Sequence, residues 1–84
     1  MNATERLACK RALEALDTIS AGLPAKALMD EVERMLHRPL ATSERDRALY
    51  LLRSKEWVYT YRNSITDEVL YAATDAGRMA MVAL

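Results

Sequence analysis

Three successive segments of the sequence repeat apolar residues at the spacing of an α-helix. In the first segment the repeating positions are Cys9, Ala12, Leu13, Leu16 and Ile19. Residues at this spacing share one helix face. Asn2 or Thr4 can cap the start of this helix, and Gly22 is placed to stop it. Pro24 then suits the first position of a second helix, because the N–H that proline lacks is not needed there.

A segment that breaks the periodicity separates the second helix from the third. The apolar face of the second helix consists of Leu28, Val32, Met35 and Leu36. Residues 37–41 follow, and Pro39 disfavours helical geometry at the residue before it. The third helix is expected to begin with Thr42 or Ser43 as its N-cap and to end near residue 55. Its predicted inner face consists of Ala48, Leu49 and Leu52.

Aromatic and β-branched residues become frequent from Trp57 onward and predict a β-hairpin. Residues 57–62 and 68–73 have the composition of strands, and Asn63-Ser64 is a turn signal between them. Thr74 can cap a short last helix. This order predicts a mainly α fold with a small β-hairpin, in which a three-helix core is followed by the hairpin and a short C-terminal helix. The 84 residues are enough for one domain, spanning residues 1–84, and too few for two.

The segment from Thr42 to Arg78 resembles the recognition helix and wing of a winged helix-turn-helix domain. The matching pieces are Thr42-Ser43, Leu49 and Leu52, Lys55-Glu56, Trp57-Val58, and Thr74-Asp75-Ala76-Gly77-Arg78. The resemblance covers roughly residues 23–78. It implies a small DNA-binding protein, similar to prokaryotic or phage-type transcriptional regulators, that uses helix 42–55 and the wing 57–73.

Three features depart from the pattern of that family. Glu56 stands where the family usually has a glycine before the wing, which predicts a wider turn or a longer helix at this point. Arg45 falls on the inward face of the third helix, where the family favours an apolar residue, and it is expected at the rim, facing solvent or phosphate. The turn between the second and third helices is also longer than the tightest helix-turn-helix.

The resemblance also implies a set of residues that contact DNA, because the third helix of such folds enters the major groove. These residues are Ser43, Arg45, Arg47, Tyr50, Arg53, Lys55, Arg62 and Asn63. Arg47 could read a guanine bidentately, while the basic residues at the helix end and on the wing could hold phosphates. In the alternative interpretation Arg47 is only solvated, because Glu44 and Asp46 beside it would repel phosphate.

The formal net charge is zero, but the charges are unevenly distributed along the chain. Residues 1–33 carry four bases and six acids, a balance of −2, and residues 63–84 carry one base and three acids, again −2. Residues 34–62 carry seven bases and three acids, a balance of +4. This basic segment contains the third helix and the first wing strand, where a polyanion would bind. Overall neutrality supports a second interpretation, a winged-helix adaptor that binds protein and not nucleic acid.

Trp57, Tyr59 and Tyr61 alternate along one strand and therefore share a face. Such a face could stack the bases of single-stranded nucleic acid. A stripe of this kind more often packs over the helices, so a core position is expected for these residues.

Catalytic and metal chemistry find no support in the residue pattern. The single cysteine, Cys9, lies at a core-type helical position, and the single histidine, His37, falls in a loop, so neither a disulfide nor a Cys/His metal set can form. We expect no enzyme activity and no cofactor. A reducing cytoplasm is the expected location, and no apolar stretch is long enough to suggest a leader or a membrane span.

Two features suggest a homodimer through the first helix and the C-terminal tail. Residues 79–84 carry no charge, and Met81 and Val82 are not expected to point the same way as Met79 on one short helix, so part of this tail should be exposed. The first helix carries a stripe of small residues that permits close helix approach, namely Ala8, Ala12, Ala15 and Ile19. Two-fold pairing would place two recognition helices on successive major-groove faces. The alternative is a monomer whose tail packs on its own first helix.

Overall fold

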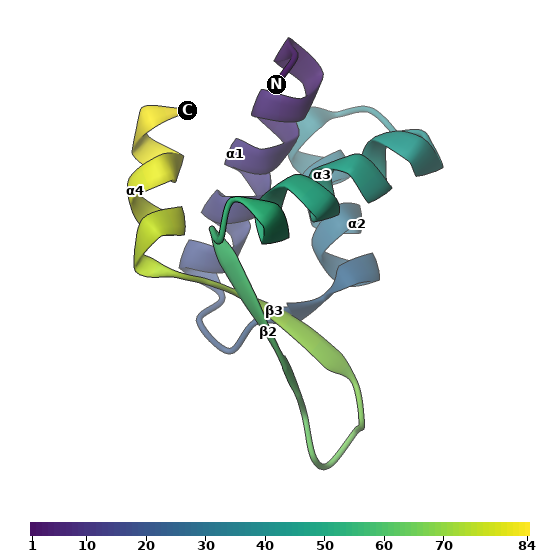
Figure 1. Ribbon diagram of the computed structural model, residues 1–84. Coiled ribbons are helices and arrows are strands. Elements are labelled where there is room, and N and C mark those ends of the chain that lie inside the picture. The colour runs from purple at the N-terminus through teal and green to yellow at the C-terminus, as the bar shows by residue number, and fades with distance from the viewer.

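The computed structural model describes all 84 residues as four helices and a small antiparallel sheet (Figure 1). The elements in chain order are α1 (Ala3–Thr18), β1 (Leu23–Pro24), α2 (Ala25–Leu36), α3 (Thr42–Ser54), β2 (Val58–Arg62), β3 (Val69–Ala73) and α4 (Asp75–Ala83). The predicted mainly α fold with a β-hairpin is confirmed, and both hairpin strands match the expected ranges to within one residue.

The helix α1 lies at the centre of the molecule and packs against each of the other three helices (Figure 1). The helix α3 crosses the front of the bundle, and β2 leaves its end and descends with β3 as a hairpin that projects away from the helices. The helix α4 stands beside α1 on the opposite side from α2. This arrangement leaves the outer face of α3 and the hairpin uncovered.

The sheet contains a third strand that the sequence analysis missed. Leu23 and Pro24 pair with Tyr71 and Leu70 of β3, so the strand order is β1-β3-β2. Gly22, at φ +87°, turns the chain into this strand, and α1 ends earlier, at Thr18. Pro24 is therefore the extended N-cap of α2, and its earlier assignment to the first helical position was wrong. Proline is tolerated here because β1 is an edge strand.

The starts of α1, α3 and α4 are fixed by side chains that accept backbone hydrogen bonds. In α1 the Asn2 side chain accepts the Glu5 N–H at 2.8 Å, and the Glu5 carboxylate accepts the Asn2 N–H at 2.9 Å. The N-cap of α3 is Ala41, so the prediction of Thr42 or Ser43 was wrong by one or two residues. Alanine has no side-chain acceptor, and the Glu44 carboxylate secures this end instead by accepting the Ala41 N–H at 2.9 Å.

One cluster of sixteen buried residues forms the core. Helix α3 contributes Ala48, Leu51 and Leu52 to it, whereas Leu49 is only half-buried and packs at its edge. The predicted inner face of α3 was therefore wrong at one position, because it included Leu49 in place of Leu51. Helical spacing alone allows Leu49 or Leu51 to face inward, and the packing of α3 on α1 buries Leu51.

The C-terminal helix packs on the core with one face and leaves the other exposed. Ala80, Met81 and Leu84 lie against the core, while Met79 and Val82 are 75% and 80% exposed. The expected exposure of part of the tail is confirmed, but Met79 and Val82 lie on the same open side, contrary to the prediction. The small-residue stripe of α1 is not open for pairing, because Ala8, Ala12 and Ala15 are buried inside the protein. No helix combines the length and the apolar character needed to cross a membrane.

Candidate nucleic-acid interface

The outward face of α3 carries a continuous row of polar and aromatic side chains. The exposed residues of this row are Ser43, Asp46, Arg47, Tyr50, Arg53 and Ser54. They recur three or four positions apart and thus follow one side of the helix. No other element covers this side in the fold (Figure 1). Ser43, Arg47, Tyr50 and Arg53 from the predicted contact set therefore occupy one accessible surface.

Arg47 is held by two neighbours on this surface. Its Nε donates a hydrogen bond to the Glu5 carboxylate of α1 at 3.2 Å, and its guanidinium carbon lies 5.2 Å from the centroid of the Tyr50 ring. The pKa of Glu5 is lowered, first by the hydrogen bond from the Asn2 backbone and then by Arg47. Glu5 is a residue of this surface that sequence reasoning missed, because it precedes Arg47 by 42 positions and no local pattern connects them.

Arg45 points away from this surface toward α2. Its Nη2 lies 2.6 Å from the Asp30 carboxylate and 3.3 Å from the Lys26 carbonyl oxygen, and its Nε lies 3.5 Å from the Glu33 carboxylate. Hydrogen bonds from Lys26 and then Arg45 lower the pKa of Asp30. Arg45 lies at the rim as expected, but with two carboxylates as partners it links α3 to α2 and is poorly placed for phosphate.

The junction between α3 and β2 presents two cations without carboxylate partners. Arg53 and Lys55 are both exposed, and neither lies within 4 Å of a carboxylate. Because their charges are not neutralised within the protein, these two side chains are the members of the predicted contact set most available for phosphate. Of the acids near them in sequence, Glu56 is also exposed and adds a negative charge at the turn.

The turn before the wing is tight despite the absence of glycine. Glu56 adopts φ +58°, and the N–H groups of Glu56 and Trp57 donate to the carbonyl oxygens of Arg53 and Leu52, both at 3.0 Å. This pair of bonds is the Schellman helix ending, which usually places glycine at the left-handed position. The expectation of a wider turn or a longer helix was wrong: Glu56 takes the strained conformation, because Trp57 and Val58 must enter the core immediately afterwards.

The wing residues of the predicted set serve the hairpin first. Arg62 Nη1 lies 3.0 Å from the Asp67 carboxylate. The Asn63 carboxamide oxygen accepts the N–H groups of Ile65 and Thr66, which organises the tip. The most exposed residue of the tip is Ile65, at 92%. The wing tip therefore offers an apolar side chain and no free cation.

Tyr59 and Tyr61 lie on the outer face of the hairpin and not in the core. Tyr59 is 52% exposed and Tyr61 is 39% exposed, with ring centroids 6.1 Å apart. The predicted core position was wrong for both, because the hairpin projects beyond the helices and Val58 is the only residue of β2 that is buried (Figure 1). Trp57 differs and is half-buried against the core. The Tyr61 hydroxyl donates to the carbonyl oxygen of Ala21, which ties the hairpin to the turn before β1.

The remaining candidates for chemistry occupy structural positions. Cys9 is fully buried, as predicted, and burial raises the pKa of its thiol to about 11. His37 is exposed at the end of α2. A cleft of about 270 Å³ lies between the starts of α1 and α3, but its lining contains one hydrophobic residue, Ala8, among polar and charged ones. Pockets for organic ligands are mostly apolar, so this cleft does not suggest an effector site.

The fold matches that of a known protein although the sequence matches none. No protein-family model and no curated protein sequence matches this chain. Among solved structures, the crystal structure of SSV1 F-93 is similar to it, with a TM-score of 0.71 and 14% sequence identity. The match covers 99% of this chain and 82% of that one. Because the sequence identity is only 14%, the similarity concerns the fold alone, which is winged-helix-like.

Proposed function

We propose that this protein binds double-stranded DNA and acts as a small transcriptional regulator. The observation that carries the proposal is the uncovered face of α3, which ends in the two unpaired cations Arg53 and Lys55. The major groove of DNA is wide enough to admit a single α-helix, so α3 could enter it with this face. The winged-helix-like fold supports the proposal, because the family that the sequence resembles uses this helix for DNA.

The free cations of this surface are sufficient for only a few phosphate contacts. Arg53 and Lys55 keep their full charge for a ligand, whereas Arg45, Arg47 and Arg62 each have a carboxylate partner within the protein. An unpaired cation releases a counterion from DNA without first losing an ion pair. We therefore expect weak binding that depends mainly on these two residues.

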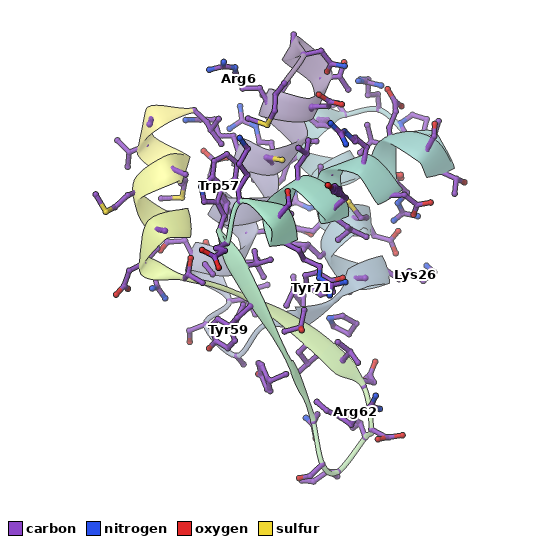
Figure 2. The ribbon with its side chains drawn as sticks, in the orientation of Figure 1. Arg6, Lys26, Trp57, Tyr59, Arg62 and Tyr71 are labelled. Carbon is purple, nitrogen blue, oxygen red and sulfur yellow. The ribbon has the colours of Figure 1, made fainter.

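The test is a titration of duplex DNA of random sequence at several salt concentrations. The wild type should bind at low salt, and Arg53→Ala should reduce the slope of log affinity against log salt by about 0.9 for the lost phosphate contact. Arg6→Ala is a matched control, because Arg6 is an exposed, unpaired helical arginine that points away from the face of α3 (Figure 2). An absence of binding at low salt, or equal slopes for the two variants, would contradict the proposal.

A protein-binding adaptor is the second candidate. It is favoured by the pairing of Arg47 with Glu5 and of Arg62 with Asp67, which neutralises cations that DNA would require. The exposed aromatic pair on the hairpin and the exposed Ile65 add contact area suited to protein. A salt-independent association with protein, combined with no affinity for duplex DNA, would favour this candidate.

A homodimer through α4 would complete the DNA-binding proposal. Met79 and Val82 form an exposed apolar pair on one side of α4, whereas the small-residue stripe of α1 is already used in the core. Sedimentation equilibrium should give a dimer for the wild type and a monomer for the double variant Met79→Lys, Val82→Lys. Ile65→Lys, which alters an equally exposed apolar residue on the wing, should leave the mass unchanged. A monomeric wild type would remove the dimer and, with it, the expected placement of two recognition helices on successive major-groove faces.

A further inference from the structure

The Glu5 side chain connects the first turn of α1 to the exposed face of α3. Its Oε1 accepts the N–H of Asn2 at 2.9 Å, and its Oε2 accepts the Nε–H of Arg47 at 3.2 Å. The side chain is only 19% exposed. Both oxygens are thus occupied, and one of them is anchored to the backbone. The position of the carboxylate relative to α3 is therefore fixed by the backbone N–H of Asn2, a bond that does not involve the Asn2 side chain.

The contact with Glu5 leaves the functional end of Arg47 free. The bond uses Nε, and neither terminal nitrogen makes a hydrogen bond within the protein. The Tyr50 ring, 5.2 Å from the guanidinium carbon, is a second neighbour of the guanidinium. The Arg47 side chain remains 53% exposed. A flexible arginine is in this way restricted on one side and open on the other.

We propose that Glu5 is a positioning residue that presents Arg47 to a guanine in the major groove. This inference rests on the proposed DNA binding and assigns its base preference. Bidentate recognition of guanine O6 and N7 is the commonest specific contact of arginine with DNA. It requires two donors directed at one base edge, and the terminal nitrogens of Arg47 are the free pair.

The benefit of Glu5 is the reduction of the ordering that binding requires. A free arginine side chain loses rotamer freedom when it is immobilised, and pre-organisation removes part of this cost before the DNA arrives. A good bidentate arginine–guanine pair discriminates against other bases by about 5- to 150-fold. Release of Arg47 from Glu5 is expected to lower that preference by about 2- to 10-fold.

The opposite role, in which Glu5 sequesters Arg47 from DNA, disagrees with the geometry. A sequestering carboxylate would engage the terminal nitrogens, and Glu5 engages Nε alone. The two roles also differ in what they predict for specificity. Removal of a positioning residue lowers the preference for guanine, whereas removal of a sequestering residue preserves or raises it. Overall affinity does not separate the two roles, because loss of the Glu5 negative charge favours DNA binding in both and opposes the effect of the lost pre-organisation.

The first experiment selects binding sequences from a randomised duplex pool with four proteins in parallel. Wild type should yield a motif with one strongly preferred guanine that Arg47→Ala loses. Glu5→Ala should weaken the preference at that same position by about 2- to 10-fold. Asn2→Ala is the control. It removes the side-chain oxygen that accepts the Glu5 N–H but keeps the backbone N–H that anchors the carboxylate, so it should keep the preference. Full retention of the preference in Glu5→Ala would overturn the inference while leaving the DNA-binding proposal intact.

The second experiment measures the Arg47 side chain in the free protein. In a ¹H–¹⁵N NMR spectrum the Nε–H of Arg47 should exchange with water more slowly than that of Arg6, which is exposed and has no partner. Glu5→Ala should remove this difference. Equal exchange of the two arginines in the wild type would overturn the positioning role whatever the DNA result. A slow Arg47 signal in a protein that enriches no sequence would instead place the failure in the proposed function.

Discussion

The replacement of Gly77 by alanine is expected to destabilise the protein, although alanine is the better helix former. Gly77 is buried at the third position of α4, where this helix meets the start of β2. A Cβ at this position would lie 2.0 Å from the carbonyl oxygen of Trp57 and 3.1 Å from Cδ2 of Leu13. Ordinary contacts of a Cβ begin near 3.4 Å. The alanine therefore requires a displacement of more than 1 Å between α4 and the chain at Trp57.

The obstructing atom cannot move away cheaply, because it belongs to the backbone and already accepts a hydrogen bond. The Trp57 carbonyl oxygen accepts the N–H of Thr74 at 3.0 Å, and the Thr74 hydroxyl caps α4 by accepting the N–H of Gly77 at 3.0 Å. Overpacking of this kind costs about 3 kcal/mol at the upper end of its usual range. The intrinsic preference of a helix for alanine returns up to about 1 kcal/mol. The expected net loss is about 2 kcal/mol in the free energy of unfolding.

Urea denaturation followed by circular dichroism measures this loss of free energy directly. In a separate thermal unfolding experiment, the midpoint temperature of a domain of this size should fall by about 8–16 °C. Ala76→Gly is the control, because Ala76 is the exposed neighbour of Gly77 and its substitution tests propensity alone, at a cost of up to about 1 kcal/mol. If α4 did not approach Trp57 closely, Gly77→Ala would stabilise the protein. A midpoint equal to or above that of the wild type would therefore refute the reasoning.

Three further predictions concern the core and the turn before the wing. Leu52→Ala removes a fully buried side chain and should cost about 2–5 kcal/mol, clearly more than Leu49→Ala at the half-buried edge of the core. Equal losses of the two variants in urea unfolding would show that the described rotation of α3 about its axis is wrong. Glu56→Gly relieves a left-handed φ of 58° and should stabilise by about 1 kcal/mol, so a destabilised variant would contradict the Schellman ending. The Cys9 thiol has its pKa raised to about 11, whereas an unfolded thiol ionises near 8.5, so its contribution to stability is complete below about pH 8.5 and is lost as the pH rises toward 11. Between pH 8.5 and 10 the urea midpoint of the wild type should therefore fall more steeply than that of Cys9→Ala, and parallel curves would refute this assignment.

Local sequence patterns determined most of the secondary structure of this protein. The spacing of apolar residues placed the three long helices, and the change of residue type after Trp57 placed the hairpin to within one residue. Thr74 was recognised as the cap of α4 from its residue type, and its side chain accepts the N–H of Gly77. These features were predictable because each depends on conformational preferences and hydrogen bonds within a few residues of the chain.

The surface proposed to bind DNA was only partly predictable. The exposure of Arg47 and Tyr50 follows from helical spacing, which fixes directions around one helix axis. The inward direction of Arg45 follows from the same spacing, but its pairing depends on Asp30 and Glu33, which belong to a different helix. Whether an arginine on α3 is free or paired is thus decided by charges that another element brings within reach.

The tertiary structure alone decided which faces are covered and which distant residues meet. Leu23 forms a strand because Tyr71 lies beside it, and neither residue indicates the other in the sequence. Tyr59 is exposed because the hairpin projects beyond the helices (Figure 1), although its residue type suits a core equally well. Glu5 reaches Arg47 because α1 and α3 are packed against each other. A sequence specifies the period of each element locally, but the partner of each face is chosen by the packing that buries the most apolar surface for the whole chain.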